Sequence, residues 1–258
     1  MYRSIDMSSF PKEREEKLKS IDRYNFFSVL FYRSNLWMHS HRVLWLLEEL
    51  APLAKKHMKF DLEKARALAL VHDDAEMLTG DVQAIVKARV SKKELKKLEM
   101  DDMKAIDVLA KKYPKTVHGY SYKALLLHAA KKDCIEAQLV SYVDKMDAYC
   151  ESLHEVYAGN ISLIRSVIFY ANNIPLFSKK FPKLAPFLES KESPFTFIGD
   201  QISPYKIDAK KYKHLLKPYT KETVKLNNDF LFYKRWKEIV IKKGHIDWLI
   251  KQKEFLPK

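Results

Sequence analysis

The chain has 258 residues, a length that suits one large domain or one domain with an appendage. Apolar residues make up 47% of it, as in folded globular proteins, and its five glycines are too few for the tight turns of a sandwich or barrel. Long stretches rich in Leu, Lys, Glu, Ala and Met predict an all-α protein.

The two cysteines, Cys134 and Cys150, cannot form a disulfide framework. The N-terminal residues lack the apolar core of a signal peptide. No uninterrupted apolar stretch reaches the roughly 18–20 residues that a membrane-spanning helix needs. We therefore expect a soluble, cytoplasmic protein.

The formal net charge is +14, and residues 201–258 hold fifteen Lys and Arg against six Asp and Glu. A basic segment of this kind can attract nucleic acid, anionic lipid or phosphorylated small molecules. The alternative is an ordinary lysine-rich surface in contact with solvent.

The first half of the chain contains several predicted helices. Residues 12–34 are amphipathic, and Leu36–Leu50 forms a helix whose continuation Pro52 restricts. Asp61 has the position of an N-cap for a further helix, which Gly80 ends.

Helices are also predicted in the second half. Val90–Ala110 begins with a capping box made by Ser91 and Glu94. Pro114 and Gly119 mark a break before another helical stretch, and Cys134–Val156 forms a long helix with one apolar face.

The pattern loosens after residue 158. Five prolines between residues 170 and 205 predict short helices and loops, and Phe230–Ile250 predicts a final helix rich in Lys and aromatic residues. We expect a domain over residues 1–158 and a basic helical extension over residues 159–258. This extension is too apolar for a free tail, so we expect it to pack on the core or to form an oligomer contact.

One string of residues carries the chemistry, His72-Asp73-Asp74-Ala75-Glu76 and onward to Asp81. A His on an upstream helix and an Asp on a long downstream helix accompany it. Imidazole and carboxylate together suit divalent Mn, Co, Fe, Ni or Zn, whereas Mg prefers oxygen ligands. Ligands from separate helices can hold one ion and leave positions open for water and a phosphate oxygen.

These residues resemble the HD-domain superfamily of metal-dependent phosphohydrolases, whose pattern is His, then His-Asp, then Asp. HDDAEMLTGDVQAIVK, residues 72–87, is similar to the signature of its 5′-deoxynucleotidase branch, and residues 35–43 and 143–155 also resemble that branch. The resemblance implies an HD-domain helical bundle that hydrolyses deoxyribonucleoside monophosphates.

The resemblance also implies roles for single residues. His39, His72, Asp73 and Asp144 would bind one metal ion, with His41 and Asp147 as the alternatives to His39 and Asp144. Two acidic residues would act in catalysis: Glu76 on the attacking water, and Asp81 on water or sugar.

The branch has an upstream Arg-Trp pair that binds phosphate and shapes the sugar pocket. Arg23-Tyr24 is the nearest match, so Tyr24 replaces the Trp, and Arg33 is the competing arginine. Met38 stands where the branch usually has an acidic residue.

Three functions remain open. The first is a phosphomonoesterase with one ion, acting on nucleoside 5′-monophosphates as a homodimer. The second is a two-metal phosphodiesterase or nuclease in which His118 and His128 are added ligands. The third is a nucleotide- or nucleic-acid-binding module that uses the basic C-terminus.

Overall fold

The computed structural model describes residues 5–25, 27, 34–157, 160–191 and 229–242. Contacts divide the chain into two compact units: unit 1 is Met1–Ser28 with Arg33–Asp144, and unit 2 is Val29–Tyr32 with Lys145–Lys258. The division falls inside one long helix, α8 (Ile135–Tyr157). The domain boundary expected at residue 158 stays a prediction.

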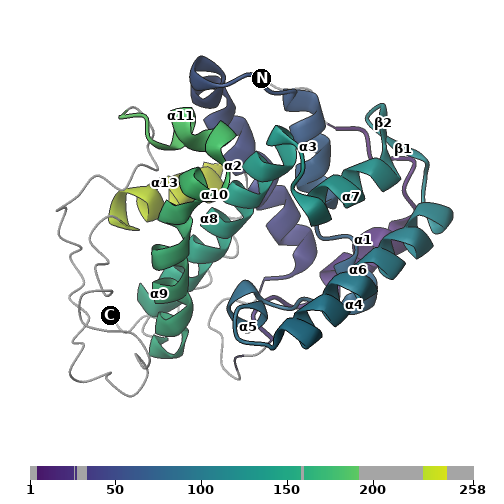
Figure 1. Ribbon diagram of the computed structural model, residues 1–258, viewed down its shortest axis with the longest axis horizontal. Helices are drawn as coiled ribbons and strands as arrows, with labels where there is room; N and C mark the ends of the chain where they lie inside the picture. The colour runs from purple at the N-terminus through teal and green to yellow at the C-terminus, as the bar shows by residue number, and fades with distance from the viewer. Residues whose placement is uncertain (1–4, 26, 28–33, 158–159, 192–228, 243–258) are drawn as a thin grey trace. The chain divides into compact units, whose positions relative to one another are not determined.

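The described residues are predominantly helical, which confirms the predicted all-α class (Figure 1). Apart from α8, unit 1 contains α1 (Lys12–Lys19), α2 (Leu36–His57), α3 (Leu62–Val71), α4 (Glu76–Thr79), α5 (Ala84–Lys87), α6 (Lys92–Lys112), β1 (Thr116–Val117), β2 (Tyr120–Ser121) and α7 (Tyr122–Lys131).

Helix α3 lies at the centre of unit 1. It packs against α2 and α7, and α7 packs in turn against α6 (Figure 1). Five of its side chains are completely buried: Ala65, Ala67, Leu68, Ala69 and Val71. Small side chains allow neighbouring helices to approach closely, so α3 brings its C-terminal end, where the His72-Asp73 pair follows, into the interior of unit 1.

The predicted helix ends are largely confirmed. The Asp61 side chain accepts a hydrogen bond from the Lys64 amide at 3.1 Å. Ser91 and Glu94 form the reciprocal capping box at the start of α6. Gly80 follows α4 with φ +78°, a conformation that strains any residue with a Cβ.

Two helix predictions were wrong in extent. The helix after Asp61 is interrupted at Val71 by the turn that carries His72 and Asp73. Helix α2 continues past Pro52 to His57, with the Pro52 side chain exposed. The amphipathic segment 12–34 is a separate case: it contains α1, which ends at Lys19, then turns, bends and an isolated bridge over residues 20–25 and 27, and residues 26 and 28–33 lie outside the described part.

The predicted break at Pro114 and Gly119 is a short antiparallel hairpin. Strands β1 and β2 pair Val117 with Tyr120, and the turn between them has positive φ at both His118 and Gly119. A two-residue turn with positive φ at both positions has a backbone twist that matches the right-handed twist of the flanking strands.

Unit 2 contains the C-terminal part of α8 and a series of short helices. These are η1 (Ile161–Leu163), α9 (Ile164–Asn173), η2 (Ile174–Leu176), α10 (Phe177–Lys180), η3 (Pro182–Leu184), α11 (Ala185–Leu188) and α13 (Asp229–Lys242). Trp236 of α13 is completely buried, and its indole N–H donates to Asp147 Oδ1 of α8 at 2.7 Å. Residues 192–228 and 243–258, which include most of the basic segment and part of the predicted final helix, lie outside the described residues.

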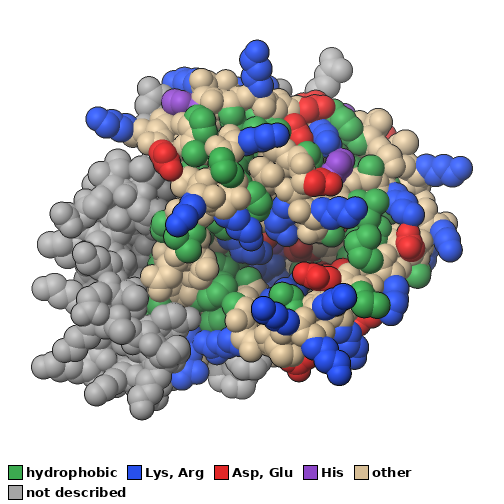
Figure 2. Space-filling view, viewed as in Figure 1, with side chains coloured by type: hydrophobic (Ala, Val, Ile, Leu, Met, Phe, Trp, Pro, Cys, Tyr) green, Lys and Arg blue, Asp and Glu red, His purple; other side chains and the backbone are tan. Residues whose placement is uncertain are grey.

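No helix among the described residues is both long enough and apolar enough to cross a bilayer. On the described part of the face drawn in Figure 2, Lys and Arg side chains are spread among Asp and Glu and do not form one continuous patch.

Candidate metal centre

Three elements of unit 1 hold the predicted ligands. His39 lies in the first turn of α2, where the Asn35 side chain caps the helix by accepting from the Met38 amide at 3.0 Å. His72 follows the last residue of α3, and Asp144 lies on α8. Each ligand therefore sits on or beside a regular helix, which restricts the movement of its side chain.

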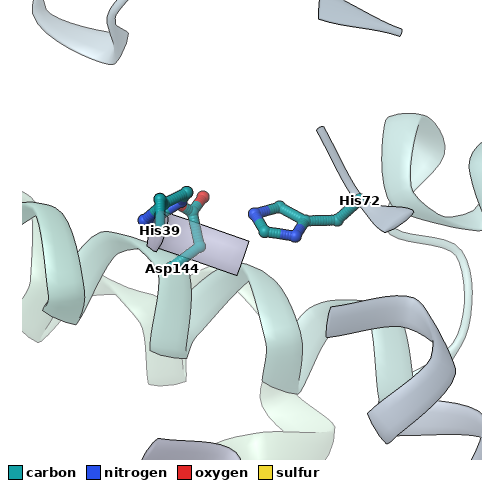
Figure 3. A group of neighbouring side chains, drawn as sticks. All are labelled: His39, His72 and Asp144. Carbon is teal, nitrogen blue, oxygen red and sulfur yellow. The ribbon is translucent and has the colours of Figure 1, made fainter. Parts of the chain in front are cut away.

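The four predicted ligands converge. The candidate donor atoms of His39, His72 and Asp144 all lie within 4.8 Å of one another (Figure 3). His39 Nε2 is 3.2 Å from Asp144 Oδ1 and 3.4 Å from Asp73 Oδ2. His72 Nε2 is 3.3 Å from the same Asp73 oxygen. Asp73 thus bridges the two imidazoles.

The donor set fits a divalent transition metal. Two imidazole nitrogens and two carboxylates suit such ions, and the two negative charges balance an ion of charge +2 in a buried position. His39 is completely buried and Asp144 is 9% exposed. His72 Nδ1 lies 2.9 Å from the Ala69 carbonyl oxygen, to which it donates, so the lone pair of the neutral ring is on Nε2.

Burial and neighbouring charges act in opposite directions on the pKa values of the cluster. Burial lowers the pKa of His72, but the Asp73 and Asp144 carboxylates outweigh it and raise the pKa above its usual value. Burial raises the pKa of Asp73, yet the His72 and His39 rings hold it below its usual range.

Glu76 lies close to this cluster. Burial and the nearby carboxylates of Asp73 and Asp81 raise its pKa well above the usual value, while Lys87 and Arg23 act in the opposite direction. A carboxyl group in such surroundings can exchange a proton at a pH where an exposed glutamate cannot. Asp81 therefore lies near Glu76, as its predicted role requires.

The predicted phosphate and sugar residues also lie near the metal cluster. Arg23 Nη1 is 4.0 Å from Asp73 Oδ2, and the Arg23 side chain is 8% exposed. Tyr24 is 3% exposed, has φ +55° and lies with its ring centroid 5.7 Å from the Arg23 guanidinium carbon. The competing Arg33 lies outside the described residues.

The alternative ligands have other contacts. His41 Nδ1 donates to the Trp37 carbonyl at 2.8 Å, and its ring lies beside Trp37 and Trp45. Asp147 belongs to unit 2, where it accepts from Trp236.

Two histidines were expected to bind a second catalytic ion. Each of them contacts a different acidic residue instead. His118 Nε2 is 3.0 Å from Glu63 Oε2, and His128 Nδ1 is 2.5 Å from Asp133 Oδ1. Neither belongs to the group of donors around His39 in the described chain.

Sequence reasoning missed two features of the site. The charge of Lys87 lowers the pKa of Glu76. The sequence could have identified Lys87, because it is the last residue of the motif over residues 72–87. Arg14 pairs with Asp74, next to Asp73, but nothing distinguishes Arg14 from the other charged residues of α1 in the sequence.

The sequence has recognisable relatives. A family profile described as 5′-deoxynucleotidase YfbR-like matches residues 15–175. A 5′-deoxynucleotidase of Vibrio parahaemolyticus is 28% identical over 176 residues, covering 66% of this chain and 86% of the relative. A 5′-deoxynucleotidase of Yersinia pseudotuberculosis is 27% identical over 198 residues, covering 74% and 95%.

The fold has relatives among solved structures. An HD-domain phosphohydrolase from Listeria innocua superposes with a TM-score of 0.53 at 18% identity, covering 70% of this chain and 90% of that one. A conserved hypothetical protein from Pyrococcus furiosus gives a TM-score of 0.54 at 23% identity, covering 69% and 92%. These similarities confirm the predicted HD-type helical fold. Because the family profile also matches more than half of its length, this chain belongs to the 5′-deoxynucleotidase YfbR-like family.

Proposed function

We propose that the protein is a metal-dependent phosphomonoesterase that converts nucleoside 5′-monophosphates, with deoxyribonucleotides preferred, to nucleoside and phosphate. The observation that carries the proposal is the convergence of His39, His72, Asp73 and Asp144, with Arg23 beside Asp73. The activity in the names of the Vibrio and Yersinia relatives supports the same substrate class.

In this proposal the four converging residues hold one divalent ion of the Co, Mn, Fe, Ni or Zn group. Bound there, such an ion supplies positive charge that polarises the phosphoryl group and acidifies a water molecule. The hydrogen bond from His72 Nδ1 to the Ala69 carbonyl orients that ring, and Asp73 Oδ2 lies close to both Nε2 atoms, where all three would be ligands of the same ion.

The remaining residues act on water, phosphate and sugar. Glu76 accepts the proton of the attacking water, and Asp81 helps to position that water or the sugar. Arg23 donates parallel hydrogen bonds to phosphate oxygens, for which a planar guanidinium is suited. Tyr24 shapes the sugar pocket, and because it is smaller than Trp we expect weak discrimination against the ribose 2′-hydroxyl.

A hydrolysis screen tests this function. The protein is depleted of metal by chelation, supplied with Mn²⁺, Co²⁺, Ni²⁺, Fe²⁺ or Zn²⁺, and assayed on dAMP, AMP, dATP and bis-p-nitrophenyl phosphate. We expect phosphate from dAMP above all others, with AMP second. Turnover of only dATP or only the diester would overturn the proposal.

A matched pair of variants makes the screen specific. Glu76→Gln should abolish hydrolysis, whereas Glu99→Gln, on the exposed face of α6, should leave it unchanged. Equal activity in the two variants would remove Glu76 from the mechanism.

We further propose that the enzyme is a cytoplasmic homodimer. Neither Cys134 nor Cys150 forms a disulfide, as is usual in a reducing compartment. Light scattering coupled to size exclusion measures the assembly.

A further inference from the structure

A second group of metal-ligating side chains lies elsewhere in unit 1. His128 is in the last turn of α7, and Asp133 and Cys134 lie in the connection between α7 and α8. Nitrogen, oxygen and sulfur donor atoms of these residues all lie within 4.8 Å of one another. The group shares no residue with the His39 cluster and takes no part in the proposed hydrolysis.

The backbone explains why these side chains meet. Lys132 has the left-handed conformation, φ 55° and ψ 39°, and its amide donates to the His128 carbonyl at 2.7 Å. This cap reverses the chain, so Asp133 and Cys134 come back towards the last turn of α7. The Gln138 side chain donates to the Lys132 carbonyl at 2.9 Å and holds the turn in place.

The group can be reached by an ion from solvent. The His128 side chain is 29% exposed and that of Asp133 is 48% exposed, while Cys134 is half-buried. His128 Nδ1 and Asp133 Oδ1 are 2.5 Å apart, which shows that two of the donors already point towards each other. An ion entering between them replaces this contact with two ligand bonds.

The donor chemistry selects the kind of ion. One imidazole, one carboxylate and one thiolate suit a borderline-soft divalent cation such as zinc, and not magnesium or calcium. Thiolate and carboxylate together balance a charge of +2. Such ions prefer tetrahedral coordination, so the protein fills three positions and water the fourth.

We propose that His128, Asp133 and Cys134 form a second, non-catalytic binding site for a thiophilic divalent cation of the zinc class. On binding, the Cys134 thiol releases one proton to solvent, and the proton that His128 Nδ1 shares with Asp133 is replaced by the ion, leaving the neutral ring with its proton on Nε2 or passing one to solvent; no oxidation state changes. The ion joins the end of α7 to the start of α8 and so stabilises unit 1.

Cobalt distinguishes the two sites, because only a thiolate ligand produces a sulfur-to-cobalt charge-transfer band in the near ultraviolet. The His39 cluster contains no sulfur. The metal-depleted full chain, kept reduced with a phosphine, is titrated with Co²⁺ while absorbance and bound cobalt are recorded. We expect total bound cobalt to approach two per chain, and the final intensity of the band to be that of one thiolate-bound cobalt per chain.

Variants assign the band to these residues. Cys134→Ser should abolish it, whereas Cys150→Ala, at the other cysteine, should retain it. His128→Gln and Asp133→Asn should each weaken the cobalt affinity of this site at least tenfold, since each removes one of three protein ligands. His118→Gln is the matched control, because His118 pairs with Glu63 outside the group.

Absence of the band in the reduced wild-type protein, or its persistence in Cys134→Ser, would overturn the proposal. Hydrolysis is a separate readout: Cys134→Ser should keep the activity of the wild type. The charge-transfer band therefore tests this site even if the proposed nucleotidase activity proves wrong.

Discussion

Arg14 and Asp74 form a buried ion pair with two parallel hydrogen bonds, directly beside the candidate ligand Asp73. Arg14 Nε donates to Asp74 Oδ2 at 2.8 Å, and Nη2 donates to Oδ1 at 2.6 Å. Tyr122 donates to Asp74 Oδ2 at 2.8 Å, and Arg14 also donates to the Leu70 carbonyl at 2.8 Å. Helices α1 and α7 thereby hold the turn that presents His72 and Asp73.

Arg14→Ala should therefore destabilise unit 1 and weaken metal binding together. The variant leaves the 1% exposed Asp74 without its cation, a change that costs about 3–5 kcal/mol in a buried pair. Urea unfolding followed by circular dichroism measures the loss. Lys12→Ala is the control, since Lys12 pairs with Glu16 at an exposed position. An unchanged unfolding midpoint in Arg14→Ala would contradict the structural role.

Asp73→Ala should abolish both hydrolysis and metal binding at the His39 cluster while leaving the helical content largely intact. Asp73 faces both imidazoles but contributes little to the apolar packing of α3. Phosphate release from dAMP measures the hydrolysis, elemental analysis measures the bound metal, and circular dichroism measures the helical content. Full activity in this variant after chelation and dialysis would refute the HD-type mechanism.

The double variant His118→Ala with His128→Ala should retain most hydrolytic activity. Both histidines pair with surface carboxylates of their own, Glu63 and Asp133. The rate of dAMP hydrolysis per amount of folded protein is compared between the double variant and the wild type. Loss of hydrolysis would favour the two-metal phosphodiesterase instead, whereas loss of one ion with hydrolysis retained agrees with a separate, non-catalytic site at His128.

Arg23→Ala should raise KM and lower kcat together. Loss of one charged contact to a phosphate costs about 2–4 kcal/mol in transition-state binding, or very roughly 30- to 1,000-fold in kcat/KM. Arg89→Ala, at an exposed arginine after α5, is the control. A variant with normal kcat/KM on dAMP would exclude Arg23 and direct attention to Arg33.

Lys87→Met should move the acidic limb of the pH–rate profile to higher pH. The Lys87 charge lowers the pKa of Glu76, so its removal raises that pKa further. If Glu76 must be deprotonated to accept a proton, more alkaline solution is then needed for the same rate. Lys92→Met, exposed in α6, provides the comparison. A shift to lower pH, or none, would contradict the proposed proton acceptor.

Local features were predictable from the sequence. The Asp61 cap, the Ser91–Glu94 box and the Gly80 stop depend on contacts between residues at most four positions apart, so the physical reason for each is visible in a short segment. The extent of the helices was less predictable, because Pro52 inside α2 and the break after Val71 depend on which face meets water or the core.

The motif around His72 was enough to nominate the metal ligands, since their types and order follow the HD pattern along the sequence. Only the tertiary structure could bring His39 and Asp144 to within 3.2 Å of each other or select Arg14 as the partner of Asp74. Trp236 and Asp147, 89 residues apart, are a further example. Each of these pairs joins distant segments, and a composition or a periodicity contains no information about which distant side chains share one buried space.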